Sequence, residues 1–113
     1  MEHRWFARKP ISGSVVVECP RVGRVTAYMR DVSLTGMFVE SPQTIFPLNT
    51  PVVVSFSLPR QRRFGGYRLQ AMIMRRGARG AGLMFLDLGS GTAQALRREL
   101  DGAATVPGNA PAS

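Results

Sequence analysis

The stretch RDVSLTGMFVE, residues 30–40, joins two segments with the pattern of β-strands and therefore decides the fold. Residues 24–33, which overlap the start of this stretch, alternate apolar Val25, Ala27 and Met29 with polar or larger side chains. This period of two predicts a strand with one buried face. Residues 36–40, GMFVE, return as a second apolar segment after a very short connection. The stretch predicts two consecutive antiparallel strands.

Four further segments have the composition or the alternation of strands. They are SVVVEC (14–19), VVVSFSL (52–58), YRLQAMIMR (67–75) and AGLMFLDL (81–88). The proline-containing SPQTIFPLNTP (41–51) is predicted as a loop over Ile45, Phe46 and Leu48. Six short strands hide their edges most simply by closing, so we predict a mainly β protein, a six-stranded antiparallel β-barrel.

The period changes to that of a helix near the end of the chain. SGTAQALRREL (90–100) has apolar residues at helical spacing, Ser90 or Thr92 as a candidate N-cap, and Gly102 as a candidate terminator. We expect this helix to cover the mouth or flank of the barrel. The predicted organisation is a flexible arm over 1–13, the barrel with its helix over 14–101, and a disordered tail over 102–113.

The composition limits the possible functions. The chain has 113 residues, enough for one domain, and a formal charge of +8 in which Lys9 is the sole lysine among 15 basic residues. Arginine has a planar guanidinium that suits phosphates and guanine edges, so we expect an anionic partner. Charge alone leaves a small ligand, a nucleic acid and a merely solubilising surface open.

Several classes of function are disfavoured. Cys19 and His3 are single residues of their kinds, which excludes an internal disulfide and disfavours a zinc site. No nucleophile stands beside a base and no usual phosphate-binding loop is present, so we expect neither an enzyme nor a cofactor. A signal peptide and an apolar run long enough to cross a bilayer are not seen. These features predict a soluble, cytoplasmic protein without membrane insertion.

Two polar motifs are candidate halves of one site. Asp31 and Ser33 project from the same side if the chain is extended between them, and Gly36 supplies either a positive φ or a surface that a ligand can approach closely. The alternative for this motif is an ordinary serine or Asx turn between two strands. The other half is RWFAR, which places Arg4 and Arg8 four residues apart before the first strand.

Together, and in this order, the two motifs resemble the paired signatures of the PilZ domain family, Arg-x-x-x-Arg and Asp/Asn-x-Ser-x-x-Gly. The similarity extends over roughly residues 3–100 and includes GMFVE, LPRQ, AMIMRRG and GLMF. It implies a six-stranded barrel that binds cyclic di-GMP. By the same resemblance, Arg4 and Arg8 hold phosphates and guanine edges, Asp31 and Ser33 contact a guanine, and Gly36 makes room.

The resemblance also implies a second-messenger receptor that regulates a separate effector protein, in motility, biofilm formation or exopolysaccharide synthesis. We expect the arm to become ordered over the ligand, with Trp5, Lys9 and Arg75 as possible accessory contacts. Two alternatives are a small basic barrel that binds single-stranded nucleic acid through the basic, aromatic stretch RQRRFGGYR (60–68), and a PilZ adaptor that binds no ligand.

Overall fold

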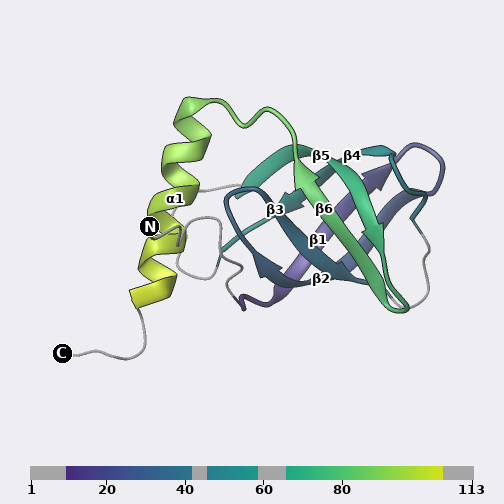
Figure 1. The fold of residues 1–113 in the computed structure, drawn as a ribbon, viewed down its shortest axis with the longest axis horizontal. Helices are drawn as coiled ribbons and strands as arrows, with labels where there is room; N and C mark the ends of the chain where they lie inside the picture. Colours follow the sequence, from purple (N-terminus) through teal and green to yellow (C-terminus); the bar gives the residue numbers. More distant parts are fainter. Residues whose placement is uncertain (1–9, 42–45, 59–65, 106–113) are drawn as a thin grey trace.

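The computed structural model describes residues 10–41, 46–58 and 66–105, with the backbone alone beyond residue 101. This part of the chain forms six strands and one helix (Figure 1). They are β1 (Gly13–Cys19), β2 (Gly23–Val32), β3 (Gly36–Glu40), β4 (Pro51–Phe56), β5 (Tyr67–Arg76), β6 (Gly80–Phe85) and α1 (Ser90–Thr105). All six predicted strands are present, and β6 ends three residues before the predicted boundary at 88.

The strands close into a barrel in the order β1-β2-β3-β6-β5-β4, with β4 pairing back onto β1. Every neighbouring pair is antiparallel. The predicted six-stranded antiparallel barrel is therefore confirmed. Because β3 pairs with β6 and not with β4, the connection after β3 crosses to the other side of the barrel.

The barrel is filled by one hydrophobic core. Inward-facing residues of all six strands are buried, among them Val17, Met29 and Ile73, each with no exposed surface. Phe46 packs into this core as predicted, and Cys19 is a buried, free cysteine. Ile45 lies outside the described residues. The core accounts for the alternating burial that the sequence pattern predicts.

Leu48 differs from its prediction, because its side chain is 44% exposed instead of packed under the loop. The turn that carries it is held on β5 by two backbone hydrogen bonds. The Asn49 amide donates to the Ile73 carbonyl (2.8 Å), and the Ile73 amide donates to the Thr50 carbonyl (3.0 Å). Asn49 itself has a φ of 59°, a left-handed conformation that asparagine tolerates well. The turn therefore holds Leu48 beside β5, at the surface.

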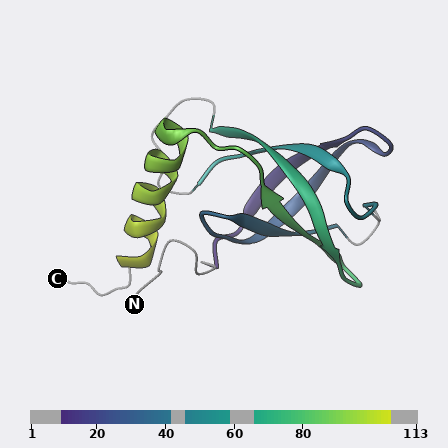
Figure 2. The same ribbon diagram turned by 45° about the horizontal axis from the view of Figure 1, so that its top comes forward.

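Helix α1 stands at one end of the barrel, and the β5–β6 turn lies at the far end (Figures 1 and 2). Leu96 and Leu100 are completely buried and belong to the same core as the strands. The Ala93 amide donates to the Gly89 carbonyl (3.0 Å), which places the N-cap at Gly89 instead of Ser90 or Thr92. Gly102 does not end the helix, which continues to Thr105. Among the described residues, no helix is long and apolar enough to cross a membrane.

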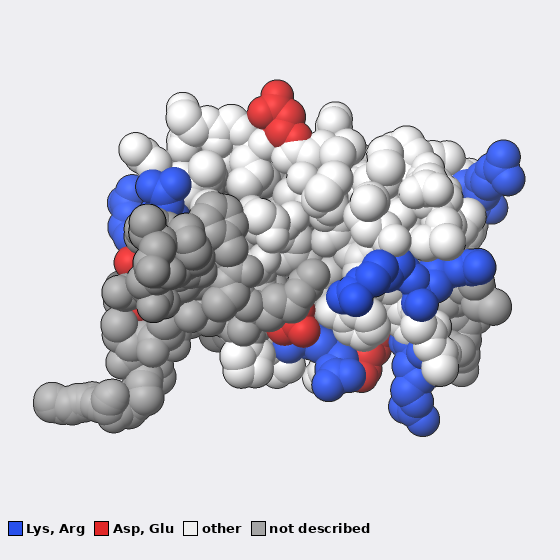
Figure 3. Space-filling model, in the orientation of Figure 1, with Lys and Arg blue, Asp and Glu red and all other residues white. Residues whose placement is uncertain are grey.

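Charged side chains cluster unevenly on the outside of the barrel. On the face shown in Figure 3, arginine side chains lie toward the end away from α1 and along the lower edge, with a further group at the α1 end. Some are paired: Arg68 and Arg24 lie 3.0 and 3.9 Å from Glu18, and Arg30 lies 2.9 Å from Glu40. These arginines are more than half exposed, so each pair contributes little to stability. The excess of positive charge remains available to an anionic partner.

Candidate functional site

A β-bulge in β2 determines where Asp31 points. Met29 pairs with Val39 and Asp31 pairs with Phe38, so Arg30 is an extra residue with no residue opposite it in the pairing register of β3. Met29 and Val32 are both fully buried, whereas Asp31 is only partly buried. Strict alternation from Met29 would have turned Asp31 into the core and Val32 outward. The bulge changes the phase by one residue and places Asp31 on the outer face.

A second bulge acts in the same way on β5. Ile73 pairs with Leu83 and Arg75 pairs with Gly82, which leaves Met74 as the extra residue. Ile73 is buried and Arg75 is exposed. Without the bulge, Arg75 would occupy an inward position in the alternation. The second bulge therefore places this guanidinium on the outer face, as the first places the carboxylate.

These two residues belong to one row of cross-strand partners. Asp31 pairs with Phe38, Phe38 with Gly82, and Gly82 with Arg75 across β2, β3, β6 and β5. Cβ and Nε of Arg75 both lie 3.6 Å from the point where a Cβ on Gly82 would stand, and Cδ1 of Phe38 lies 3.9 Å from it. Gly82 is buried on the outer face because these side chains cover it. We call Asp31, Phe38, Gly82 and Arg75 the outer row.

Ser33 builds the turn that follows Asp31. Its amide donates to the Gly36 carbonyl (2.8 Å), and its Oγ accepts from the Thr35 amide (3.2 Å). The same Oγ lies 3.1 Å from Oγ1 of Thr35 and 3.4 Å from the Gly36 carbonyl oxygen, and Ser33 is 1% exposed. The serine turn that the sequence allows is thus present. These contacts use most of the hydrogen-bonding capacity of the Ser33 hydroxyl. The main structural effect of this hydroxyl is therefore to fix the turn beside Asp31.

Gly36 is required by the barrel itself. Its φ is not positive, so the first of the two predicted reasons for a glycine does not hold. A Cβ at this position would stand 2.0 Å from the Leu83 carbonyl oxygen of β6. A Cβ added at Gly80, at the other end of the β3–β6 ladder, would stand 2.0 Å from the Val39 carbonyl oxygen. The two glycines allow β3 and β6 to pair at these ends, and a role for Gly36 beside a ligand stays a prediction.

The N-terminal half of the predicted site, with Arg4, Trp5, Arg8 and Lys9, lies outside the described residues. The structure therefore places Asp31, Ser33, Gly36 and Arg75 and leaves the arginine motif untested. It brings Asp31 and Arg75 into the outer row. Within the described ranges, no group of three His, Cys, Asp or Glu side chains could hold a metal ion.

The sequence prediction missed Phe38 and Gly82, which lie between Asp31 and Arg75. One signal was available, because a glycine inside the otherwise apolar strand AGLMF indicates a close approach of backbone or of another group. Nothing in the sequence identified Phe38 as facing outward, since its neighbours Met37 and Val39 are also apolar. Only the pairing register assigns it to the outer row.

Comparison with known proteins identifies the class to which this barrel and helix belong. The family model described as PilZ domain matches residues 2–102, and the chain belongs to the PilZ domain family. This family is known for receptors of cyclic di-GMP and consists of binding and adaptor domains, not enzymes.

Among solved structures, the chain is similar to the crystal structure of the PilZ domain of CeSA from a cellulose-synthesizing bacterium. The TM-score is 0.65 at 22% sequence identity, over 87% of this chain and 98% of that chain. At this identity the likeness shows the fold. No curated protein matches the chain at a significant level.

Proposed function

We propose that this PilZ domain binds cyclic di-GMP on the outside of the barrel, over the outer row and the Ser33 turn. The observation that carries the proposal is the placement of Asp31 and Arg75, each by a bulge, in one row of cross-strand partners on the outside of the barrel. Bulges are enriched next to functional sites, where they re-aim a side chain. Membership of the PilZ family supports the choice of ligand.

The chemistry of the outer row suits a guanine nucleotide. The Asp31 carboxylate accepts hydrogen bonds from the N1 and N2 donors of a guanine, and a guanidinium binds guanine O6 and N7 or a phosphate. Phe38 lies between these two charged groups and offers an aromatic ring against which a base can stack. Arg4 and Arg8 complete the site in this proposal by contacting phosphates and guanine edges from the N-terminal arm.

The proposal includes regulation of a separate effector protein. Ligand contacts that come from both the arm and the barrel would order the arm against the outer row, and this would change the surface that a partner meets. Trp5 and Lys9 move with the arm and are accessory contacts. The cellular process under control, whether motility, biofilm formation or exopolysaccharide synthesis, follows from the identity of that effector.

Calorimetry with cyclic di-GMP tests the binding step. We expect the wild-type chain to bind and Arg4→Ala, Arg8→Ala and Asp31→Ala to lose at least about tenfold in affinity, equivalent to about 1.4 kcal/mol per site. Asp87→Ala is the matched control for Asp31→Ala, because Asp87 is exposed and lies outside the outer row. A folded chain that gives no heat and no rise in Tm with cyclic di-GMP would contradict the proposal and favour the ligand-free adaptor.

Filter binding separates the nucleic-acid alternative. A barrel that binds single-stranded RNA or DNA would show tight, sequence-tolerant binding whose affinity falls steeply with salt concentration. Under the proposed function we expect oligonucleotides to bind weakly at physiological salt and not to displace cyclic di-GMP.

A further inference from the structure

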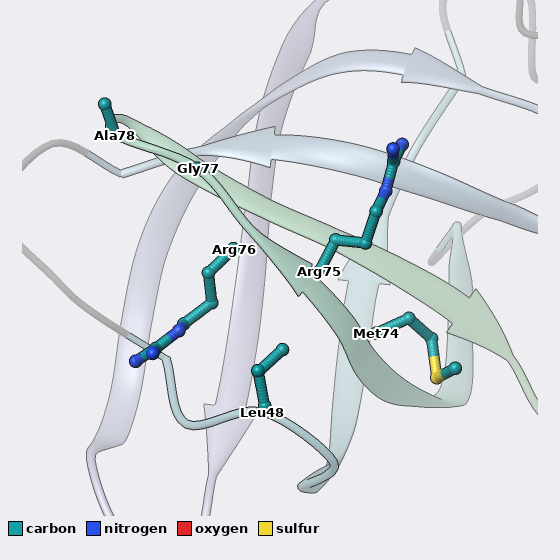
Figure 4. Close-up of a pocket in the computed structure, with 6 residues that line it drawn as sticks. All are labelled: Leu48, Met74, Arg75, Arg76, Gly77 and Ala78. Atoms are coloured by element: carbon teal, nitrogen blue, oxygen red, sulfur yellow. The ribbon is translucent and has the colours of Figure 1, made fainter.

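A groove lies on the side of β5, between the Leu48 turn and the β5–β6 hairpin (Figure 4). Its volume is about 690 Å³. The residues that line it are Leu48, Met74, Arg75, Arg76, Gly77 and Ala78. They combine exposed apolar side chains with two guanidinium groups and include no acidic residue.

Both walls of the groove are fixed by backbone hydrogen bonds. The Leu48 turn is held on β5 by the two bonds between Ile73 and the Asn49–Thr50 segment, and Oγ1 of Thr50 donates to the Leu48 carbonyl (3.2 Å). On the other side, the Gly77 amide donates to the Gly80 carbonyl (2.9 Å) and closes the hairpin. The groove is therefore largely formed before anything binds, which reduces the entropic cost of docking.

Two exposed apolar side chains line the groove. Leu48 is 44% exposed and Met74 is 43% exposed, two of the five large hydrophobic residues that are exposed in the described part of the chain. Met74 follows the buried Ile73 on β5 and so faces outward in the alternation. Methionine is flexible and polarisable, and it is common on surfaces that bind peptide segments. A hydrophilic ligand alone would leave this surface unused.

The charges of the groove select the partner. Arg75 and Arg76 extend from β5 in opposite directions, and Arg76 extends toward the side on which Leu48 lies (Figure 4). Neither makes an ion pair with a described residue. A second copy of this chain carries +8 and would be repelled. The segments of this chain that are not described contain one acidic side chain, Glu2. Both observations favour an acidic segment of another protein.

We propose that the groove docks a segment of a partner protein that carries a large apolar side chain next to carboxylates. The apolar side chain covers Leu48 and Met74, and the carboxylates pair with Arg76 and with Arg75 at the edge. Such pairs fix orientation and speed association, while the buried apolar contact supplies most of the affinity. The proposal stands whether or not the domain binds cyclic di-GMP.

NMR titration of the isotope-labelled full chain tests this site. The probe is a short synthetic peptide, blocked at both ends, in which leucine alternates with aspartate and glutamate. A matched peptide with lysine in place of the acidic residues is the first control. We expect the acidic peptide to shift the amide signals of Leu48 and of residues 74–78, and the lysine peptide to leave them unchanged.

Two pairs of charge-matched variants separate the groove from general electrostatics. Met74→Glu and Arg76→Glu should each weaken binding of the acidic peptide by at least about tenfold. Met84→Glu and Arg98→Glu, which make the same charge changes at exposed positions outside the groove, should change it by less than about twofold. Equal losses within a pair, or shifts confined to other basic residues, overturn the proposal.

Two further results also overturn it. If a single-stranded oligonucleotide shifts the same amides and displaces the peptide, the groove is a polyanion site instead of a peptide site. If the groove signals shift with protein concentration in the absence of peptide, a second copy of the chain occupies it. Each variant is first checked for the wild-type pattern of amide signals elsewhere in the barrel.

Discussion

Asp31 and Arg75 lie on the same outer row of the barrel, and each follows directly after a β-bulge. Three strand spacings of about 4.8 Å separate them, so their Cα atoms lie about 14 Å apart along the sheet. Phe38 and Gly82 fill the space between them. Because the barrel is closed and β2 and β5 are three strands apart in either direction, the row passes around half of the barrel.

This relationship predicts that Asp31 and Arg75 contribute independently to binding of cyclic di-GMP. Residues more than 7–10 Å apart with no shared partner usually have additive effects on free energy. We expect Arg75→Ala to lower affinity by about tenfold, and the double variant with Asp31→Ala to lower it by the product of the two single losses. Calorimetry on the four proteins of this cycle measures the additivity.

Arg68→Ala is the control for Arg75→Ala, because Arg68 is exposed on the same strand and pairs with Glu18 outside the outer row. A loss of affinity in Arg68→Ala equal to that in Arg75→Ala would show that net charge matters and position does not. The outer row would then not be the binding surface.

Gly36→Ala should destabilise the barrel whether or not a ligand is present. The added Cβ would stand 2.0 Å from the Leu83 carbonyl oxygen, so β3 would have to move away from β6. We expect the free energy of unfolding to fall by about 2 kcal/mol or more, as measured by urea denaturation. Gly91→Ala is the control: no atom lies within 4 Å of the added Cβ, and alanine at this helical position should stabilise by up to about 1 kcal/mol.

If Gly36→Ala were as stable as the wild type but had lost affinity for cyclic di-GMP, the glycine would serve the ligand and not the barrel. The structure predicts instead that Gly36→Ala lowers the free energy of unfolding, whatever its effect on affinity. Binding should therefore be compared at a temperature where both variants are fully folded.

Ser33→Ala should weaken the turn as well as the site. The Thr35 amide loses its acceptor, which is expected to cost about 1 kcal/mol in the free energy of unfolding. Ser55→Ala is the control, because Ser55 is partly buried and pairs regularly with β5. It should change the free energy of unfolding by less than about 0.5 kcal/mol. Thermal unfolding without ligand measures both. A Ser33→Ala chain with wild-type stability would show that the hydroxyl does not support the turn.

Much of the fold could be predicted from the sequence, because hydrophobic alternation sets both the strands and their buried faces. The outward placement of Asp31 could not, since a bulge adds one residue to the alternation without a characteristic residue type. One clue was present: strict alternation from Met29 to Val32 buries an acid and exposes a valine, and this conflict indicates an irregularity. The same reasoning applies to Arg75 after Ile73.

Other differences arise from tertiary contacts that no local pattern shows. Gly102 ends a helix by intrinsic preference, yet α1 continues past it to Thr105, with Leu96 and Leu100 anchored in the core. Leu48 was expected under a loop, but hydrogen bonds from its turn to Ile73 hold it at the surface. The apolar pattern of the sequence does not show which apolar residues stay exposed. Because the groove is formed by such exposed residues, it could not be predicted from the sequence.

Arg75 belongs to both the outer row and the groove, so the two proposed sites should be coupled. A nucleotide that engages the guanidinium of Arg75 withdraws it from an acidic peptide. We expect saturating cyclic di-GMP to weaken the binding of the acidic peptide several-fold in the wild type and to have little effect in Arg75→Ala. Because coupling between two ligands is reciprocal, the peptide should weaken cyclic di-GMP by the same factor.

Calorimetric titration of each ligand in the presence of the other measures this factor in both directions, with Arg68→Ala as the control that should retain it. An equal coupling factor in the wild type and in Arg75→Ala would assign the coupling to a different element, such as the N-terminal arm. A factor of one in the wild type would mean that the two sites act independently and that an effector docked in the groove stays bound at any concentration of the messenger.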